Sequence, residues 1–220
     1  MDLLFDLDGT LTNPEEGITR CIQFALEAVG PGPLPERSSL RRCIGPPLQE
    51  SFAELLETSD SVRIDEAITK YRERYTDVGI LENELYDDIP GGLAALRQAG
   101  HRLWVATSKP RVFAERVVAL FDLTSFFEKV YGAELDGTNS AKSDLIATIL
   151  SKEQLDRSEV CMIGDRSHDI VGGRANRTYT VGVLWGFGTE AELRQARPDA
   201  VVDSMSGLQD SVKSLGKGRS

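Results

Sequence analysis

Short apolar runs bounded by turn residues recur along the 220-residue chain, at Leu3–Phe5, Leu103–Ala106, Val160–Ile163, Val181–Leu184 and Ala200–Val202. Each run is shorter than an ordinary core helix. Continuous apolar runs of this length are typical of strands that are buried on both faces, as in a parallel sheet. They constrain the fold more than any other feature, because parallel strands need long crossover connections that cover the faces of the sheet.

Helical patterns lie between most of these runs, at Leu93–Ala99, Val112–Leu120, Leu145–Leu150 and Ala191–Ala196. Gly100 follows the first pattern and Pro110 precedes the second, as helix-ending and helix-starting residues do. Strands that alternate with helices predict an α/β fold with a doubly wound parallel sheet.

The interval between the first two apolar runs is far longer than the roughly 30 residues that a strand-helix-strand unit needs. Within it, apolar residues follow helical spacing over Ile18–Val29, Leu48–Leu56 and Ile64–Tyr75, with no strand pattern between them. We therefore predict an all-helical insertion at residues 13–83. The predicted core then comprises residues 1–12 and 84–220.

The composition is that of a folded, soluble protein, with 40% hydrophobic and 27% charged residues. Asp and Glu exceed Lys and Arg by 35 to 25, and this acidic balance excludes a partner that is a nucleic-acid polymer. No apolar run approaches the roughly 18 residues of a membrane span, and a signal-peptide pattern is missing, so we predict a cytoplasmic protein without membrane contact. The three cysteines are interpreted as small core residues rather than as a disulfide or zinc framework.

Polar residues gather directly after the predicted strands and at the starts of the helices that follow. They are Asp6, Asp8, Gly9 and Thr10 after the first strand, Thr107 and Ser108 after the second, Lys142 at a helix start, and Asp165 and Asp169 after the third. In open α/β sheets the carboxyl ends of the strands carry the functional groups. The N-terminus of the helix that follows Pro110 is a favourable position for binding an anion.

Each of these motifs alone has a structural interpretation as a turn, a helix cap or a solvated surface. Together, unpaired carboxylates on one rim repel each other by about 4 kcal/mol per pair at 4 Å and an effective dielectric of 20. A cation is therefore expected among them, and acidic oxygen ligands beside a phosphate favour Mg²⁺. A phosphate dianion would meet about twice that repulsion, which Mg²⁺ and Lys142 together offset.

These residues resemble the four motifs of the haloacid dehalogenase-like hydrolases over nearly the whole chain. Asp6 to Thr10 resemble the first motif, Thr107 the second, Lys142 the third and Gly164 to Asp169 the fourth, in the family's order. The helical insertion resembles the family's first type of cap on a Rossmann-like core. Ile44–Leu48 and Trp185–Gly188 are similar to segments of phosphoglycolate phosphatases and 5′-nucleotidase-like enzymes.

The resemblance implies a role for each motif residue. Asp6 would be the nucleophile that forms an aspartyl-phosphate, and Asp8 would protonate the leaving alkoxide and then activate water. Mg²⁺ would be bound by Asp6, the backbone carbonyl of Asp8 and Asp165, with Asp169 either a direct ligand or an outer-shell residue. The substrate's phosphoryl group would be bound by Asp6, Gly9, Thr10, Thr107, Ser108 and Lys142.

The implied function is a Mg²⁺-dependent phosphatase for a small phosphorylated metabolite, either phosphoglycolate or a nucleoside 5′-monophosphate. In the family, a carboxylic acid at the position of Asp8 indicates phosphate chemistry rather than dehalogenation. Two alternatives stay open, namely a phosphomutase of the same family and a receiver-like signalling module. The sequence leaves the oligomeric state undetermined.

Five further positions have structural interpretations. Lys109 is a weaker rival to Lys142 that would turn toward a helix, and His168 would be an exposed residue at a helix start. Trp185 would pack as a lid on the core. Asn176-Arg177 stands where relatives often have Asn-Gly, which affects the local turn rather than the mechanism.

Overall fold

A computed structural model describes residues 1–30 and 32–216. The chain folds as two compact units. The first comprises Met1–Thr12 and the described part of Leu85–Ser220, and the second comprises Asn13–Glu84. The assignment of the second unit as a cap stays a prediction.

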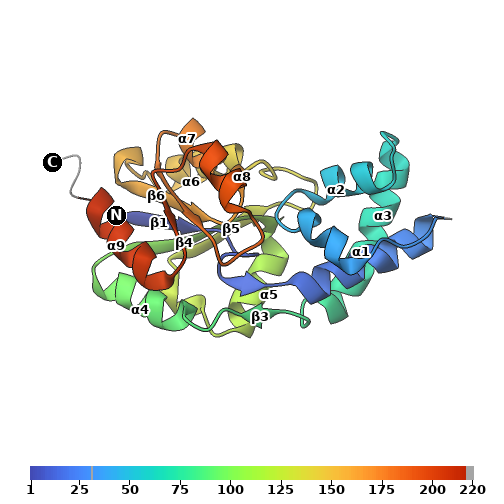
Figure 1. Ribbon diagram of the computed structural model, residues 1–220, viewed down its shortest axis with the longest axis horizontal. Helices are drawn as coiled ribbons and strands as arrows, with labels where there is room; N and C mark the ends of the chain where they lie inside the picture. The colour runs from blue at the N-terminus through green and yellow to red at the C-terminus, as the bar shows by residue number, and fades with distance from the viewer. Residues whose placement is uncertain (31, 217–220) are drawn as a thin grey trace. The chain divides into compact units, whose positions relative to one another are not determined.

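The first unit is built on a six-stranded sheet with the order β5-β4-β1-β6-β7-β8, in which every pairing is parallel. Its strands are β1 (Asp2–Phe5), β4 (Arg102–Pro110), β5 (Lys129–Ala133), β6 (Val160–Gly164), β7 (Tyr179–Val183) and β8 (Ala200–Val202). The central strand β1 lies between β4 and β6, with Phe5 paired with Val105 and Ile163. The chain segments that follow these three strands therefore emerge at the same edge of the sheet (Figure 1).

Helices cover both faces of this sheet (Figure 1). They are α4 (Ile89–Gln98), α5 (Arg111–Leu120), α6 (Lys142–Lys152), α7 (Ser167–Ala175), α8 (Glu190–Ala196) and α9 (Met205–Leu215), with short 3₁₀ turns η3 (Thr124–Phe126) and η4 (Arg157–Glu159). Leu145, Ile146 and Ile149 of α6 pack on Leu4 and Met162 of the sheet. This α/β architecture confirms the predicted fold class.

The second unit is helical. It contains α1 (Glu15–Val29), η1 (Arg37–Cys43), α2 (Leu48–Leu55), α3 (Ser61–Arg74) and a π-helical turn η2 (Tyr75–Gly79). Its core includes the edge-to-face pair of Phe52 with Tyr71 and the stacked pair of Tyr71 with Tyr75. The apolar spacing within the insertion thus predicts helices where the structure has them.

The two connections between the units, β2 (Thr12–Asn13) and β3 (Glu84–Leu85), pair as a two-stranded sheet. Among the described residues, none of the helices has both the length and the apolar character that crossing a membrane requires. All three cysteines are buried, in agreement with their interpretation as core residues.

Two elements of the first unit have no counterpart in the sequence-based expectation. The edge strand β5 contains Lys129, Tyr131 and Gly132, so it lacks the continuous apolar run of a central strand. The helix α9 follows β8 directly and buries only Met205, Leu208 and Val212 along one side. The apolar pattern of β5 is interrupted by Lys129 and Gly132, and α9 is buried along one side only.

Candidate active site

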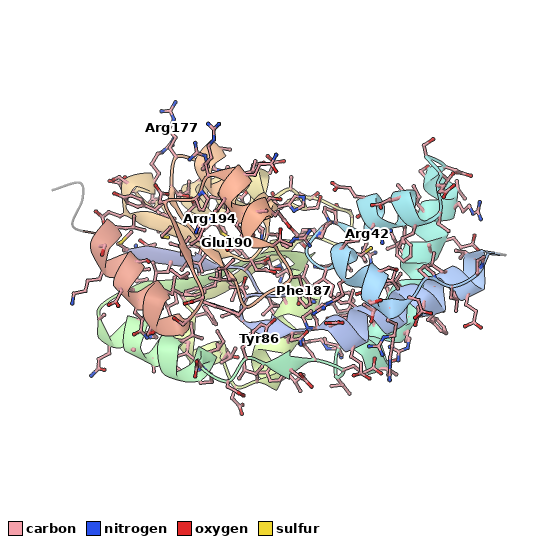
Figure 2. The ribbon with its side chains drawn as sticks, in the orientation of Figure 1. Arg42, Tyr86, Arg177, Phe187, Glu190 and Arg194 are labelled. Carbon is pink, nitrogen blue, oxygen red and sulfur yellow. The ribbon has the colours of Figure 1, made fainter. Side chains whose placement is uncertain are left out.

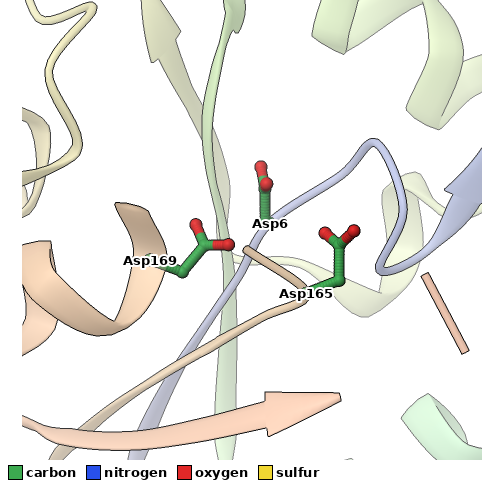
Figure 3. Close-up of side chains that lie close together, drawn as sticks. All are labelled: Asp6, Asp165 and Asp169. Atoms are coloured by element: carbon green, nitrogen blue, oxygen red, sulfur yellow. The ribbon is translucent and has the colours of Figure 1, made fainter. Parts of the chain in front are cut away.

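Three buried aspartates meet at the carboxyl edge of the sheet (Figure 3). Asp6 follows β1, Asp165 follows β6 and Asp169 lies in the first turn of α7. One carboxylate oxygen from each lies within 4.8 Å of the others. At that distance each ionised pair repels by about 3 kcal/mol at an effective dielectric of 20. The cluster therefore requires compensating positive charge.

Lys142 supplies part of this compensation from the first residue of α6. Its Nζ lies 3.0 Å from Asp6 Oδ1 and 2.8 Å from Asp169 Oδ1, and it donates to the Ala106 carbonyl at 2.9 Å. Burial acts to lower the pKa of Lys142, but the carboxylates of Asp169 and Asp6 outweigh burial and raise it. The ammonium group is therefore a fixed positive charge between these two aspartates.

Lys142 does not compensate all of the negative charge, and the raised pKa values of Asp165 and Asp169 reflect this. Burial, together with the carboxylates of Asp169 and Asp6, raises the pKa of Asp165 to about 8. Burial also raises the pKa of Asp169 to about 6, against the opposing effect of Lys142. With all three aspartates ionised, three carboxylates and one ammonium leave two negative charges, which one divalent cation would neutralise. Oxygen donors of this kind fit Mg²⁺.

Local hydrogen bonds orient the cluster. The Leu7 N–H donates to Asp6 Oδ1 at 2.8 Å, and the Arg166 N–H donates to Asp169 Oδ2 at 3.1 Å. Asp165 accepts from the Phe187 N–H at 2.8 Å and from the Thr10 hydroxyl at 3.2 Å. The aspartates are therefore held by backbone and hydroxyl donors as well as by the lysine.

The turn after β1 brings its backbone against Asp165. Gly9 has a φ of +86°, and a Cβ at this position would lie 2.2 Å from Asp165 Oδ2. Only glycine meets both demands. The Trp185 indole N–H donates to the Thr10 carbonyl at 3.0 Å, which ties the loop after β7 to the same turn.

Asp8 lies outside the three-aspartate cluster and forms a separate buried ion pair with Lys109. Burial raises the pKa of Asp8, and the Lys109 ammonium opposes this effect. Thr107 is also buried, and its hydroxyl accepts a hydrogen bond from the Lys109 N–H at 3.3 Å. Ser108, between these two residues, is partly buried.

The sequence-predicted residues thus come together at one edge of the first unit. Asp6, Asp165, Asp169 and Lys142 form one ion-paired group, Gly9 and Thr10 adjoin Asp165, and Thr107 precedes the lysine that binds Asp8. His168 is exposed, as predicted. The interpretation of Trp185 as a packed lid is refined by its hydrogen bond to Thr10.

The interpretation of Lys109 is wrong. Its side chain does not turn toward a helix but binds the Asp8 carboxylate, and it is only 6% exposed. The strand pairing explains this, because the register of β4 against β5 shifts between Thr107 and Pro110. The sequence shows a lysine two residues after Thr107, but the direction of its side chain depends on the register shift.

The arrangement matches a known family. Residues 3–183 match the model of the family described as haloacid dehalogenase-like hydrolase. The chain belongs to this family. As a haloacid dehalogenase-like hydrolase it is an enzyme, and the receiver-like alternative falls away.

Relatives of this hydrolase carry several names. A 5′-nucleotidase from Pseudomonas aeruginosa is 44% identical over 97% of this chain and 96% of its own length. The tyrosine-protein kinase PtkA of Mycobacterium tuberculosis is 36% identical over 97% of this chain and 72% of its own length. The crystal structure of a "predicted phosphatase" from Clostridium acetobutylicum has a TM-score of 0.93 and 36% identity, and the match covers 97% of this chain and 98% of that one.

Proposed function

We propose that this hydrolase is a Mg²⁺-dependent phosphatase that cleaves a small phosphomonoester through an aspartyl-phosphate on Asp6. The observation that carries the proposal is the buried group of Asp6, Asp165, Asp169 and Lys142, whose net charge matches that of one divalent cation. When bound, the cation would neutralise the carboxylates and polarise the phosphoryl oxygens.

In this proposal the Asp6 carboxylate attacks phosphorus, while Lys142 stabilises the charge that develops on the transferring oxygens. The P–O bond to the alcohol breaks, and Asp8 donates the proton that the departing oxygen takes up. Asp8 then accepts a proton from the water that hydrolyses the intermediate. Asp165 and Asp169 would hold the cation together with Asp6.

We propose a nucleoside 5′-monophosphate as the first substrate to test, because the 5′-nucleotidase relative shares 44% of its residues with this chain. Phosphoglycolate is the second, as the sequence motifs imply. The partner is thus a small phosphorylated metabolite. We infer that the helical unit, residues 13–84, acts as the cap that selects among such substrates.

The test is a panel of small phosphate esters ranked by kcat/KM, with Mg²⁺ and with a chelator. The panel includes hexose phosphates, because their isomerisation would indicate a phosphomutase. It also includes ATP and phosphotyrosine, because the PtkA relative is named as a tyrosine-protein kinase. Ester hydrolysis that needs Mg²⁺ is the expected result. Hydrolysis that a chelator leaves unchanged would contradict the metal assignment.

The intermediate has its own test. Borohydride reduces an acyl phosphate, so enzyme quenched during turnover should carry homoserine at position 6, which peptide mass spectrometry detects. Asp6→Asn should lose both turnover and this product, whereas Asp203→Asn, at an exposed position of the same unit, should keep both. Turnover by Asp6→Asn at the wild-type rate would defeat the proposal.

A further inference from the structure

Lys109 is a buried lysine at the active-site edge that the proposed chemistry has not used. Its Nζ forms an ion pair with Asp8 Oδ2, and the two side chains are 6% and 10% exposed. Lys142 is not available for this contact, because its ammonium already binds Asp6, Asp169 and the Ala106 carbonyl. The site thus uses two lysines, each with different carboxylates.

The backbone around Lys109 is fixed on several sides. The register shift between Thr107 and Pro110 lies at this point of β4. The Lys109 N–H donates to Thr107 Oγ1 at 3.3 Å. Gly132 of the neighbouring strand leaves room for the Lys109 carbonyl, since a Cβ there would lie 2.6 Å from that oxygen. Such support on rigid strands is what precise positioning of a functional group requires.

The two oxygens of Asp8 have different surroundings. Oδ2 is bound to Lys109, whereas Oδ1 is buried and has no hydrogen-bond partner among the described residues. A buried carboxylate oxygen without a partner is costly, and a functional role is one explanation for its persistence. An approaching leaving-group oxygen would supply the missing partner.

We propose that Lys109 is a positioning residue that binds Asp8 Oδ2 and thereby reserves Oδ1 for proton exchange with the leaving group. This inference rests on the proposed function, in which Asp8 is the acid. Asp8 enters this step protonated on Oδ1, while Oδ2 accepts a hydrogen bond from the Lys109 ammonium. As the bond from Asp6 to phosphorus forms and the bond from phosphorus to the alcohol oxygen breaks, the Oδ1 proton moves to that oxygen and leaves Asp8 as the carboxylate. The Lys109 ammonium keeps its protons throughout and holds the Asp8 rotamer.

This role predicts a dependence on the leaving group. An alkoxide leaves slowly unless it is protonated, whereas p-nitrophenolate leaves readily as an anion. A misplaced Asp8 should therefore slow the cleavage of alkyl phosphates far more than that of p-nitrophenyl phosphate. The parameter to compare is kcat/KM, because it covers only the steps up to departure of the alcohol and excludes hydrolysis of the intermediate.

The experiment compares Lys109→Met with wild type on a nucleoside 5′-monophosphate and on p-nitrophenyl phosphate. We expect kcat/KM to fall about 10- to 100-fold for the nucleotide and less than about 3-fold for the aryl ester, since general acid catalysis contributes 10²- to 10⁴-fold. Lys109→Arg, which keeps the charge and a donor, should recover part of the nucleotide activity. Lys213→Gln, at an exposed position on α9, is the matched control and should behave as wild type.

Retained activity toward the aryl ester shows that a variant is folded. If Lys109→Met does not fold, Lys109→Gln replaces it, because the neutral and shorter glutamine side chain removes the ion pair with Asp8 while it stays polar; the same difference between the two esters is expected. Equal losses on both esters, or no loss on either, would overturn the role of Lys109. Asp8→Asn distinguishes this failure from failure of the proposed function. If Asp8→Asn also shows equal losses of kcat/KM on the nucleotide and the aryl ester, then Asp8 is not the acid and the proposed function itself fails.

Discussion

Replacement of Asp165 by Asn should stabilise the protein in the absence of metal while it weakens Mg²⁺ binding. Asp165 is fully buried, and burial together with Asp169 and Asp6 raises its pKa from 3.8 to about 8. The folded protein without metal therefore binds a proton here that the unfolded chain does not bind between these pH values. Under these conditions the free energy of unfolding falls as pH rises from about 4 to about 8.

The size of the effect follows from the same pKa difference. One pKa unit corresponds to about 1.4 kcal/mol, so ionising Asp165 above pH 8 costs the folded state at most about 6 kcal/mol. Relaxation and water entry reduce such penalties, and we expect Asp165→Asn to gain about 1–3 kcal/mol at pH 8.5. The asparagine carbonyl can still accept from the Phe187 N–H, and its amide can donate to Thr10 Oγ1, so the existing partners are kept.

The assay is thermal unfolding of both proteins with EDTA and with Mg²⁺ over a range of pH. For a chain of this length, a gain of 1–3 kcal/mol raises Tm by about 2–12 °C. With EDTA the variant should melt above wild type at pH 8.5, and the difference should shrink toward pH 5. Mg²⁺ should stabilise wild type and have little effect on the variant.

Asp203→Asn removes a carboxylate at an exposed position and controls for the change in net charge. If Asp165→Asn melts at or below the Tm of wild type in EDTA at pH 8.5, the reasoning is refuted. In that case the ionised Asp165 carboxylate does not destabilise the folded protein.

Three other substitutions test the surroundings of the site. Lys142→Met should lower the free energy of unfolding, measured with urea, by about 3–5 kcal/mol, because Asp6 and Asp169 lose their buried partner. A decrease below about 1 kcal/mol would contradict the ion-pair assignment. Gly132→Ala should lower the free energy of unfolding by about 1–3 kcal/mol in the same assay, since the alanine Cβ would lie 2.6 Å from the Lys109 carbonyl oxygen. An unchanged urea midpoint would show that the backbone of β4 moves to accommodate the methyl group. Arg177→Gly should raise Tm through a gain of about 1 kcal/mol, because Arg177 has a φ of +60°; a lower Tm would mean that the arginine side chain stabilises the turn.

Much of the fold could be predicted from the sequence, because burial on both faces leaves continuous apolar runs in β1, β4, β6 and β7, and the partly buried edge strand β8 keeps a short apolar run as well. The same logic places Asp6 and Asp165 at one edge, since parallel strands end together. The edge strand β5 escaped prediction because Lys129 and Gly132 interrupt its apolar pattern, and helix α9 escaped because it is buried on one side only. The patterns of such elements resemble those of surface segments.

The amino-acid sequence alone determined which residue types stand after each strand, and therefore that acidic groups, hydroxyls and a lysine converge on one rim. Only the tertiary structure decided which lysine binds which aspartate. Lys142 lies between Asp6 and Asp169 because α6 begins beside β4, and Lys109 reaches Asp8 because the register of β4 shifts after Thr107. Ion pairs depend on side-chain directions that are set by register and backbone displacement, and spacing along the chain does not contain that information.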